Sequence, residues 1–203
     1  MSRAILFVLM AVVAGTMTGS VEAATDLFGD PLPEGAVQRL GSLRLRYGSV
    51  GDLDYLPNGR AVVASSTSID IWDMSVGKKL ASHQFAQHGL TAIDVNGDGS
   101  AMVAGDSAGH VYEWDLQDDV LIRDWETGQG RLASVYYSTD ETRALTCGTK
   151  PPTIREWDLQ TAEQLVSVTS NVYSARQAIY GPNDRTAFIH GSAGSGCAFE
   201  HYA

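Results

Sequence analysis

Cysteine and positive charge are scarce in this chain of 203 residues, which has 2 Cys and 14 Lys and Arg against 24 Asp and Glu. Two cysteines cannot build a cysteine-rich zinc module or a disulfide framework, so stability has to come from apolar burial. The formal net charge of -10 disfavours a nucleic-acid surface or an anionic membrane surface, because both need a basic field. The composition therefore predicts a globular protein whose partners are neutral or cationic.

Long hydrophobic runs are also lacking, apart from one near the N-terminus. An uncharged apolar run from Ala4 to Gly15 follows Arg3 and precedes small residues around Ala23. This run is shorter than the roughly 20 residues that span a bilayer, and its flanks are typical of a secretory signal peptide. We expect residues 1–23 to be removed and the mature protein to be periplasmic or extracellular, without membrane insertion. A buried N-terminal helix is the alternative. The Pro-, Gly- and acid-containing residues 24–39 are expected to form an extended lead-in.

A repeat of about 42 residues is the main pattern in the rest of the chain. Three Trp-Asp pairs, each ending a strand-like run, are 42 and 43 residues apart: Trp72-Asp73, Trp114-Asp115 and Trp157-Asp158. Apolar triplets recur with steps of 40, 42 and 43 residues: Val50, Leu53, Tyr55; Leu90, Ile93, Val95; Leu132, Val135, Tyr137; and Ala175, Ala178, Tyr180. Turn residues and a further apolar segment follow each triplet, which predicts a meander of short strands.

Two further sets of positions extend the repeat. The fourth triplet predicts a fourth aromatic-acid pair 85 residues after Trp114-Asp115, where Phe199-Glu200 stands. Segments of equal length that begin at Leu40, Leu80, Ile122 and Leu165 supply a fourth strand per unit. We therefore expect repeats at about residues 40–79, 80–121, 122–164 and 165–203.

A unit of four short strands that carries a Trp-Asp pair resembles the WD40 repeat family of β-propellers. The resemblance covers residues 40–200, and the lead-in is similar to the stretch before the first blade of secreted bacterial WD-repeat proteins. It implies an all-β fold, a β-propeller of about four four-stranded antiparallel blades, with the aromatic-acid pairs as structural positions.

The family's hydrogen-bonded tetrad of Trp, Ser or Thr, His and Asp is not implied here. The His is missing before each triplet, and the turn Asp is replaced by Ala108 and Pro151. We expect each blade to have lost the network that satisfies its buried indole N–H.

Few local motifs indicate chemistry. Asp94, Asn96 and Asp98 match the first half of a calcium loop, but Gly105 stands where the bidentate Glu should be, so an ordinary turn is the alternative. Ser107 lies in a G-x-S-x-G string, which we expect to be a hairpin turn rather than a nucleophile elbow. Cys147 and Cys197 either pair in an oxidising compartment or stay as separate thiols. No catalytic residue and no other cofactor or metal site is predicted.

The resemblance and the charge together predict an exported, non-enzymatic scaffold for protein-protein interaction. Acidic loops at Gln117–Asp119 and Asp140–Glu141 favour a basic protein or peptide partner. An exported propeller enzyme, either a quinone- or metal-dependent oxidoreductase or a hydrolase, and a fragment of a longer WD-repeat protein are the alternatives. Residues 40–46 are expected to complete the last sheet, which would close a four-bladed ring or, by strand exchange in a homodimer, an eight-bladed ring.

Overall fold

The computed structural model describes residues 25–26, 29–38, 49–84, 88–193 and 196–202, with side chains described as far as residue 192. The chain divides into two compact units, Met1–Ser42 and Leu43–Ala203. In the described part of the first unit, Thr25 forms an isolated antiparallel bridge with Pro31. The described residues include no helix that is long and apolar enough to cross a membrane.

The second unit is built from strands, and its described part has no α-helix. In chain order the elements are β1 (Val50–Tyr55), β2 (Arg60–Ser65), β3 (Ser68–Asp73), β4 (Lys78–Gln84), β5 (Leu90–Val95), β6 (Ala101–Asp106), β7 (His110–Asp115), β8 (Val120–Glu126), β9 (Leu132–Tyr137), β10 (Arg143–Thr149), β11 (Pro152–Asp158), β12 (Gln164–Thr169), β13 (Ser174–Tyr180), the 3-10 helix η1 (Pro182–Asp184), β14 (Ala187–Ala193) and β15 (Gly196–Tyr202).

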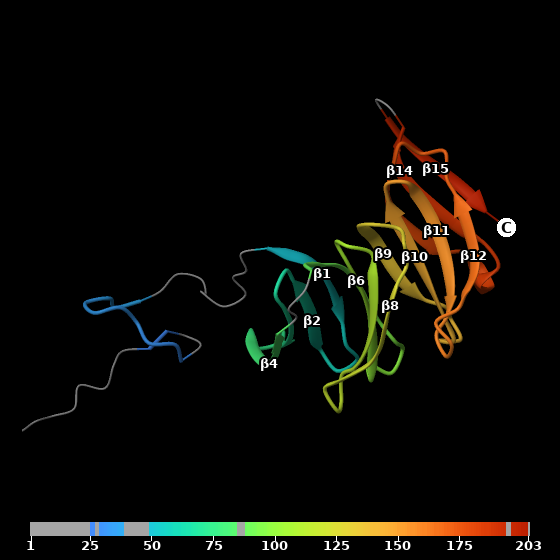
Figure 1. Ribbon diagram of the computed structural model, residues 1–203. Coiled ribbons are helices and arrows are strands. Elements are labelled where there is room, and N and C mark those ends of the chain that lie inside the picture. Colours follow the sequence, from blue (N-terminus) through green and yellow to red (C-terminus); the bar gives the residue numbers. More distant parts are fainter. Residues whose placement is uncertain (1–24, 27–28, 39–48, 85–87, 194–195, 203) are drawn as a thin grey trace, which may run out of the picture. The chain divides into compact units, whose positions relative to one another are not determined.

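These strands form four antiparallel sheets that follow one another in chain order (Figure 1). Blade 1 is β1–β4, blade 2 is β5–β8, blade 3 is β9–β12 and blade 4 is β13–β15. The predicted fold class is confirmed: the unit is all-β and propeller-like, with a four-stranded meander as its repeat. No strand pairing joins one described sheet to the next. The predicted strand at residues 40–46 lies outside the described residues.

The blades stack through the first strand of each. β1, β5, β9 and β13 are neighbours in that order, and a hydrophobic cluster fills each of the three spaces between consecutive blades. The second strand of a blade is covered on both faces, as β2 and β6 show, while the fourth strand is mostly exposed. This gradient explains the sequence pattern, because a strand that is buried on both faces needs a continuous apolar run.

Bulges recur at fixed places in the blades. One extra residue enters the first strand of every blade, at Gly51, Thr91, Ala133 and Arg176. Another enters the fourth strand of blades 1 to 3, beside the Trp-Asp pair, at Leu80, Ile122 and Leu165. A bulge increases local twist and re-aims the side chain. The periodic aliphatic residues that begin the predicted fourth strands are therefore bulge residues, and all three are exposed.

Candidate functional site

The Trp-Asp pairs end the third strand of each complete blade. Trp72 and Trp157 are 6% and 5% exposed, whereas Trp114 is half-buried. Phe199 and Glu200 lie on β15 opposite His190 and Ile189, and only their backbone is described. The pairs thus mark structural positions rather than a cleft.

The Asp of each pair holds the following turn. The Asp73 carboxylate accepts hydrogen bonds from Ser75 N (2.9 Å) and Ser75 Oγ (2.5 Å), and the Asp158 carboxylate accepts from Thr161 N (2.8 Å). Asp115 accepts from two backbone N–H groups of its own turn. Hydrogen bonds from Ser75 lower the pKa of Asp73, and those from Thr161 lower the pKa of Asp158. Asp73 and Asp158 are therefore held in the ionised form while they fix their turns.

Blade 3 contains a buried polar network around its Trp-Asp pair. Trp157 Nε1 donates to Thr146 Oγ1 (2.9 Å), which donates to Gln129 Oε1 (2.5 Å). Gln129 Nε2 donates in turn to the O (2.9 Å) and Oγ1 (3.0 Å) of Thr153. The expectation that every blade has lost its indole partner is wrong for this blade. A glutamine replaces the missing histidine, because its amide also offers both a donor and an acceptor.

In blade 2, the indole N–H of Trp114 finds its hydrogen-bond partner in an exposed turn. Trp114 Nε1 donates to Asp119 Oδ1 (3.1 Å), and the same oxygen lies 2.7 Å from His83 Nδ1 of blade 1. The half-buried position of this indole agrees with a partner in an exposed turn.

Carboxylates and a serine tie each first strand to the next blade. Asp52 and Asp54 of blade 1 accept from the backbone N–H groups of Ile93 and Val95, both at 3.0 Å. Asp94 of blade 2 accepts from Tyr137 N (2.7 Å) in the same way. The donors and acceptors are 41 or 43 residues apart, one repeat. Because neighbouring first strands do not form a ladder, these side chains satisfy the N–H groups that a ladder would use.

Ser134 continues this row at the third interface. Its Oγ accepts from Ala178 N (2.9 Å) and donates to Ala178 O (3.1 Å). All three interfaces are thus crossed by bonds from a side chain to the backbone. Bonds of this kind contribute about 1 kcal/mol each, and somewhat more when the acceptor is ionised.

A second row crosses the blades at the first turns. Glu141 accepts from Gly97 N (2.7 Å) of blade 2, and Asp184 accepts from Thr139 N (2.6 Å) of blade 3. At the first interface the equivalent residues are Gly99 and Pro57. Proline has no N–H, and a Cβ on Gly99 would lie 2.6 Å from Pro57 Cδ. The carboxylate and its donor are therefore replaced together by close packing.

Asp94, which accepts the hydrogen bond from Tyr137 N, has a raised pKa. Burial raises its pKa from 3.8 to about 6, with a further contribution from the charges of Asp54 and Asp52, although the bond from Tyr137 N opposes the shift. The folded carboxyl therefore keeps its proton at pH values where the unfolded chain releases it. The contribution of Asp94 to stability is most favourable below about pH 4 and declines until about pH 6.

We expect Asp94→Asn to stabilise the protein at about pH 8 by about 1 to 2 kcal/mol and to have little effect at about pH 4. The amide oxygen still accepts from Tyr137 N, and the cost of the buried charge disappears. Urea unfolding at the two pH values measures the difference. Asp98→Asn is the control, because the bonds from Ser100 outweigh desolvation and lower the pKa of Asp98, so its charge is favoured rather than penalised in the folded state. Equal effects of Asp94→Asn at both pH values would contradict the assignment.

Each calcium candidate accepts a backbone hydrogen bond in the structure. Asp94 binds the backbone of blade 3, Asn96 Oδ1 accepts from Ala101 N (2.9 Å), and Asp98 Oδ1 accepts from Ser100 N (2.8 Å). The last two bonds hold a hairpin turn. Within the described ranges, no group of three or more His, Cys, Asp and Glu residues is placed to hold a metal ion.

Ser107 and Cys147, the remaining motif residues, also have structural roles. Ser107 lies in the turn between β6 and β7, as predicted, and its N–H donates to Gly89 O (3.0 Å). Cys147 is a free, buried thiol, and burial raises its pKa to about 12. A thiol with such a pKa is a poor nucleophile at neutral pH.

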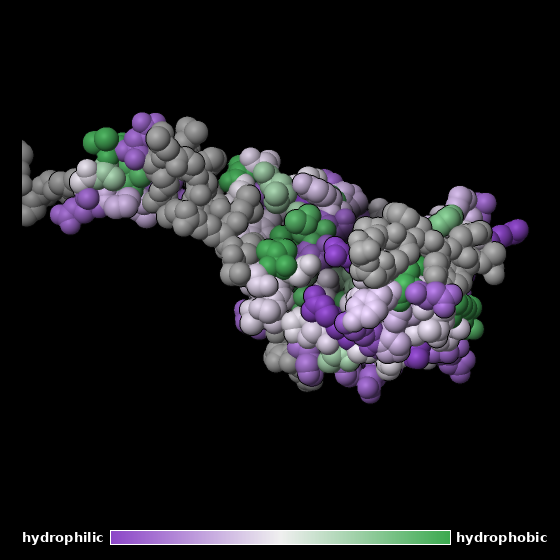
Figure 2. Space-filling model, turned by 90° about the horizontal axis from the view of Figure 1, so that it is seen from above, coloured by the Kyte–Doolittle hydropathy of each residue, from purple (hydrophilic) through white to green (hydrophobic). Residues whose placement is uncertain are grey.

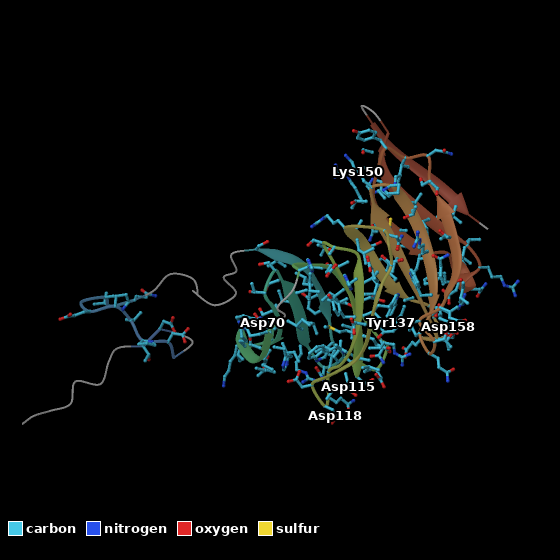
Figure 3. All side chains as sticks on the ribbon, in the orientation of Figure 1. Asp70, Asp115, Asp118, Tyr137, Lys150 and Asp158 are labelled. Atoms are coloured by element: carbon cyan, nitrogen blue, oxygen red, sulfur yellow. The ribbon has the colours of Figure 1, made fainter. Side chains whose placement is uncertain are left out.

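The acidic loops of the sequence meet at one end of the sheets. In a meander, the turn after the first strand and the turn after the third lie at the same end, so the turns of blades 2 and 3 gather there. Figure 3 shows Asp115, Asp118 and Asp158 at this end and Lys150 at the other. We call this surface the acidic end, and it carries Asp98, Asp115, Asp118, Asp119, Asp140, Glu141, Asp158 and Glu163.

The charge at the acidic end is fixed in place. Bonds from Ser138 and Thr142 lower the pKa of Asp140 to about 2, and bonds from Ser100 lower that of Asp98. The described connections at the opposite end of blades 2 and 3 carry Arg131 and Lys150 instead, with no Asp or Glu among them. Glu126, the last residue of β8, is also exposed at that end. The opposite end therefore carries charges of both signs, whereas the eight groups that define the acidic end are all negative.

Comparison with known proteins agrees with the repeat. No family model matches the chain. The chain is 28% identical to "Meiotic fizzy-related protein 1" of Schizosaccharomyces pombe over 109 residues, which cover 53% of this chain and 25% of that protein. It is 26% identical to "Protein groucho" of Drosophila melanogaster over 114 residues, which cover 54% of this chain and 16% of that protein. Both relatives are WD40-repeat proteins, so their similarity to this chain supports the WD40-like character of its repeat.

Proposed function

We propose that this protein is a non-enzymatic interaction scaffold that binds a basic protein segment at the acidic end of blades 2 and 3. The observation that carries the proposal is the gathering of eight carboxylates from four turns at one end of the stacked blades. Similarity to WD40-repeat proteins supports a binding role. A field of one sign favours a partner of the opposite sign and speeds its capture.

The turns are suited to this role because they need little ordering when a partner binds. Side-chain bonds hold Asp98, Asp140 and Asp158, and Glu141 bridges two blades. Binding groups that are already ordered lose less conformational entropy on association. Asp118 and Glu163 are exposed at the same end and face solvent.

We expect the double variant Asp118→Lys/Glu163→Lys to bind a synthetic Arg- and Lys-rich peptide about tenfold more weakly than the wild type. Isothermal titration calorimetry at physiological salt measures the affinity. The double variant Asp124→Lys/Glu126→Lys makes the same change in net charge on β8, outside the four turns of the acidic end. The proposal fails if both variants weaken binding equally, because net charge alone would then explain it.

Export by residues 1–23 belongs to the same proposal, since these residues have the composition of a secretory signal. We expect protein recovered from the periplasm of a bacterial host to begin at Ala24, as measured by intact mass. Full-length protein confined to the cytoplasm of that host would contradict export.

Association of two copies into an eight-bladed ring is a further part of the proposal. Leu53 and Tyr55 of β1 are 52% and 64% exposed, although the equivalent residues of blades 2 and 3 are at least half-buried. Hydrophobic patches also interrupt the hydrophilic surface in Figure 2. Burial of such residues against a second copy would stabilise a closed ring. Light scattering should give twice the chain mass, and a monodisperse monomer would exclude the dimer.

A further inference from the structure

The space between blades 3 and 4 contains a hollow of about 170 Å³. Its lining comes from both blades and is mainly apolar, and it includes Leu145, Ile154, Val166 and Val168 of blade 3 and Tyr180 and Ala187 of blade 4. The other two interfaces allow a direct comparison, because strand pairing sets which residues are equivalent in each blade.

The interface between blades 2 and 3 has nearly the same walls. Strand pairing identifies the equivalent residues. On the blade 2 side, Val103, Val111 and Glu113 take the positions of Leu145, Ile154 and Glu156. On the blade 3 side, Tyr137 and Ala144 take the positions of Tyr180 and Ala187. Two large side chains from β8 fill this interface. Trp125 packs with its ring centroid 6.1 Å from that of Trp157, and Arg123 Nε lies 2.8 Å from Glu113 Oε2 while its guanidinium donates to Leu159 O.

Both filling residues are valine in blade 3. Val166 pairs with Glu156 as Arg123 pairs with Glu113, and Val168 pairs with Ile154 as Trp125 pairs with Val111. Replacement of an indole and a guanidinium by two short side chains leaves the volume they would occupy. The hollow is thus a specific feature of the third interface and not a general looseness of the stack.

The first interface is filled in another way. Met102 of blade 2 stands at the position of Ala144 and Ala187, and it is fully buried in the cluster between blades 1 and 2. His83 takes the position of Trp125 and packs against Trp114, with ring centroids 6.3 Å apart. Two of the three interfaces therefore place an aromatic ring where the third has Val168.

One side of the hollow is polar. Glu156 Oε1 accepts from Arg143 (2.7 Å) and from the Tyr180 hydroxyl (3.0 Å), and Arg143 lies over the Tyr180 ring at 6.0 Å. Asp184 and Arg185 add one charge of each sign. This edge carries balanced charge and hydrogen-bonding groups, which suits a neutral ligand with a polar atom.

We infer that the hollow between blades 3 and 4 is a binding site for a small, neutral, planar aromatic compound of about the size of indole. An apolar cavity of about 150 Å³ is known to accept benzene, so the volume suffices for one or two fused rings. The ring would lie against Leu145, Ile154 and Val168, as Trp125 lies against the equivalent wall of blade 2. Its polar atom would face Glu156 and Tyr180.

Indole itself is the probe for a test by saturation-transfer NMR and calorimetry on the full chain. We expect wild-type protein to bind indole with a dissociation constant of about 0.1 to 1 mM. Val168→Trp should weaken binding at least about tenfold, because it restores the side chain of blade 2. Ala187→Met should do the same from the blade 4 side, since it copies Met102. Ser167→Trp adds the same indole to the opposite face of β12 and should leave binding unchanged.

Indole binding by the variants distinguishes a specific site from its absence. Binding by wild type and Ser167→Trp, with loss in either filling variant that remains folded by circular dichroism, supports the site. Absence of binding to wild type at millimolar indole overturns it, as does undiminished binding to both filling variants. Because these variants leave the turns of blades 2 and 3 untouched, the result is independent of peptide binding at the acidic end.

Discussion

Thr146→Val is expected to lower the free energy of unfolding by about 2 to 4 kcal/mol. The substitution keeps the shape of the side chain and removes only its hydroxyl. Thr146 is fully buried, and its Oγ1 accepts from Trp157 Nε1 and donates to Gln129 Oε1. Valine would leave the indole N–H and the glutamine oxygen without these bonds in a site that water does not reach. Urea unfolding followed by tryptophan fluorescence and circular dichroism measures the loss.

Two comparisons make this prediction specific. Thr146→Ser keeps the hydroxyl and should recover most of the stability. Thr169→Val makes the same chemical change at an exposed position of β12 and should change stability by less than about 0.5 kcal/mol. If the two valine variants have equal stability, the network does not hold blade 3 together.

Gly51→Ala is the second large effect, and we expect it to destabilise the contact between blades 1 and 2 by about 3 kcal/mol. A Cβ at this bulge would lie 2.0 Å from the carbonyl oxygen of Leu90 and 2.9 Å from its carbon. Both atoms belong to the backbone of β5, so they can give way only if the blades separate. Hydrogen exchange should show β1 losing protection before the other first strands.

A milder glycine substitution is the control. The nearest atom to a Cβ on Gly89 is Ser66 Cα at 3.3 Å, a contact that a small shift relieves. Gly89→Ala should therefore cost less than about 1 kcal/mol. Unchanged protection of β1 in Gly51→Ala would show that the first interface tolerates the added methyl group.

The sequence predicts the fold well because apolar residues and turn residues recur with the same period as the strands. The triplets mark β1, β5, β9 and β13, and the Trp-Asp pairs mark the ends of β3, β7 and β11. Similarly, Leu80, Ile122 and Leu165 recur because each is a bulge residue, although the sequence alone does not distinguish a bulge from a core position. Periodicity thus locates the elements but not the local geometry that sets the period.

The contacts between blades are harder to predict. Asp52, Asp54 and Asp94 look like exposed strand residues, yet each binds a backbone N–H one repeat later. A spacing of about 41 to 43 residues between a carboxylate and an N–H is visible only after the register of the stack is known. The role of Gln129 is hard to predict for a similar reason, because an amide makes these bonds at the position where the family has a histidine.

The acidic end could be predicted in part. The charge of the loops at Gln117–Asp119 and Asp140–Glu141 is evident from the sequence, and a meander requires that both loops lie at one end. The hollow beside Val168 could not be found in this way, because it depends on which of several equivalent positions carries the filling side chain. The position of the hollow depends on single-residue differences between the repeats, and the repeat pattern alone does not show them.

Hydrogen exchange of the full chain with and without an Arg- and Lys-rich peptide is the most direct test of the central claim, that the acidic end binds a basic partner. We expect the peptide to slow exchange in the turns of blades 2 and 3 at residues 96–100, 116–119, 138–142 and 159–163. Protection confined to the opposite end, at residues 107–109, 128–131 and 150–151, or no change in any turn, would contradict it.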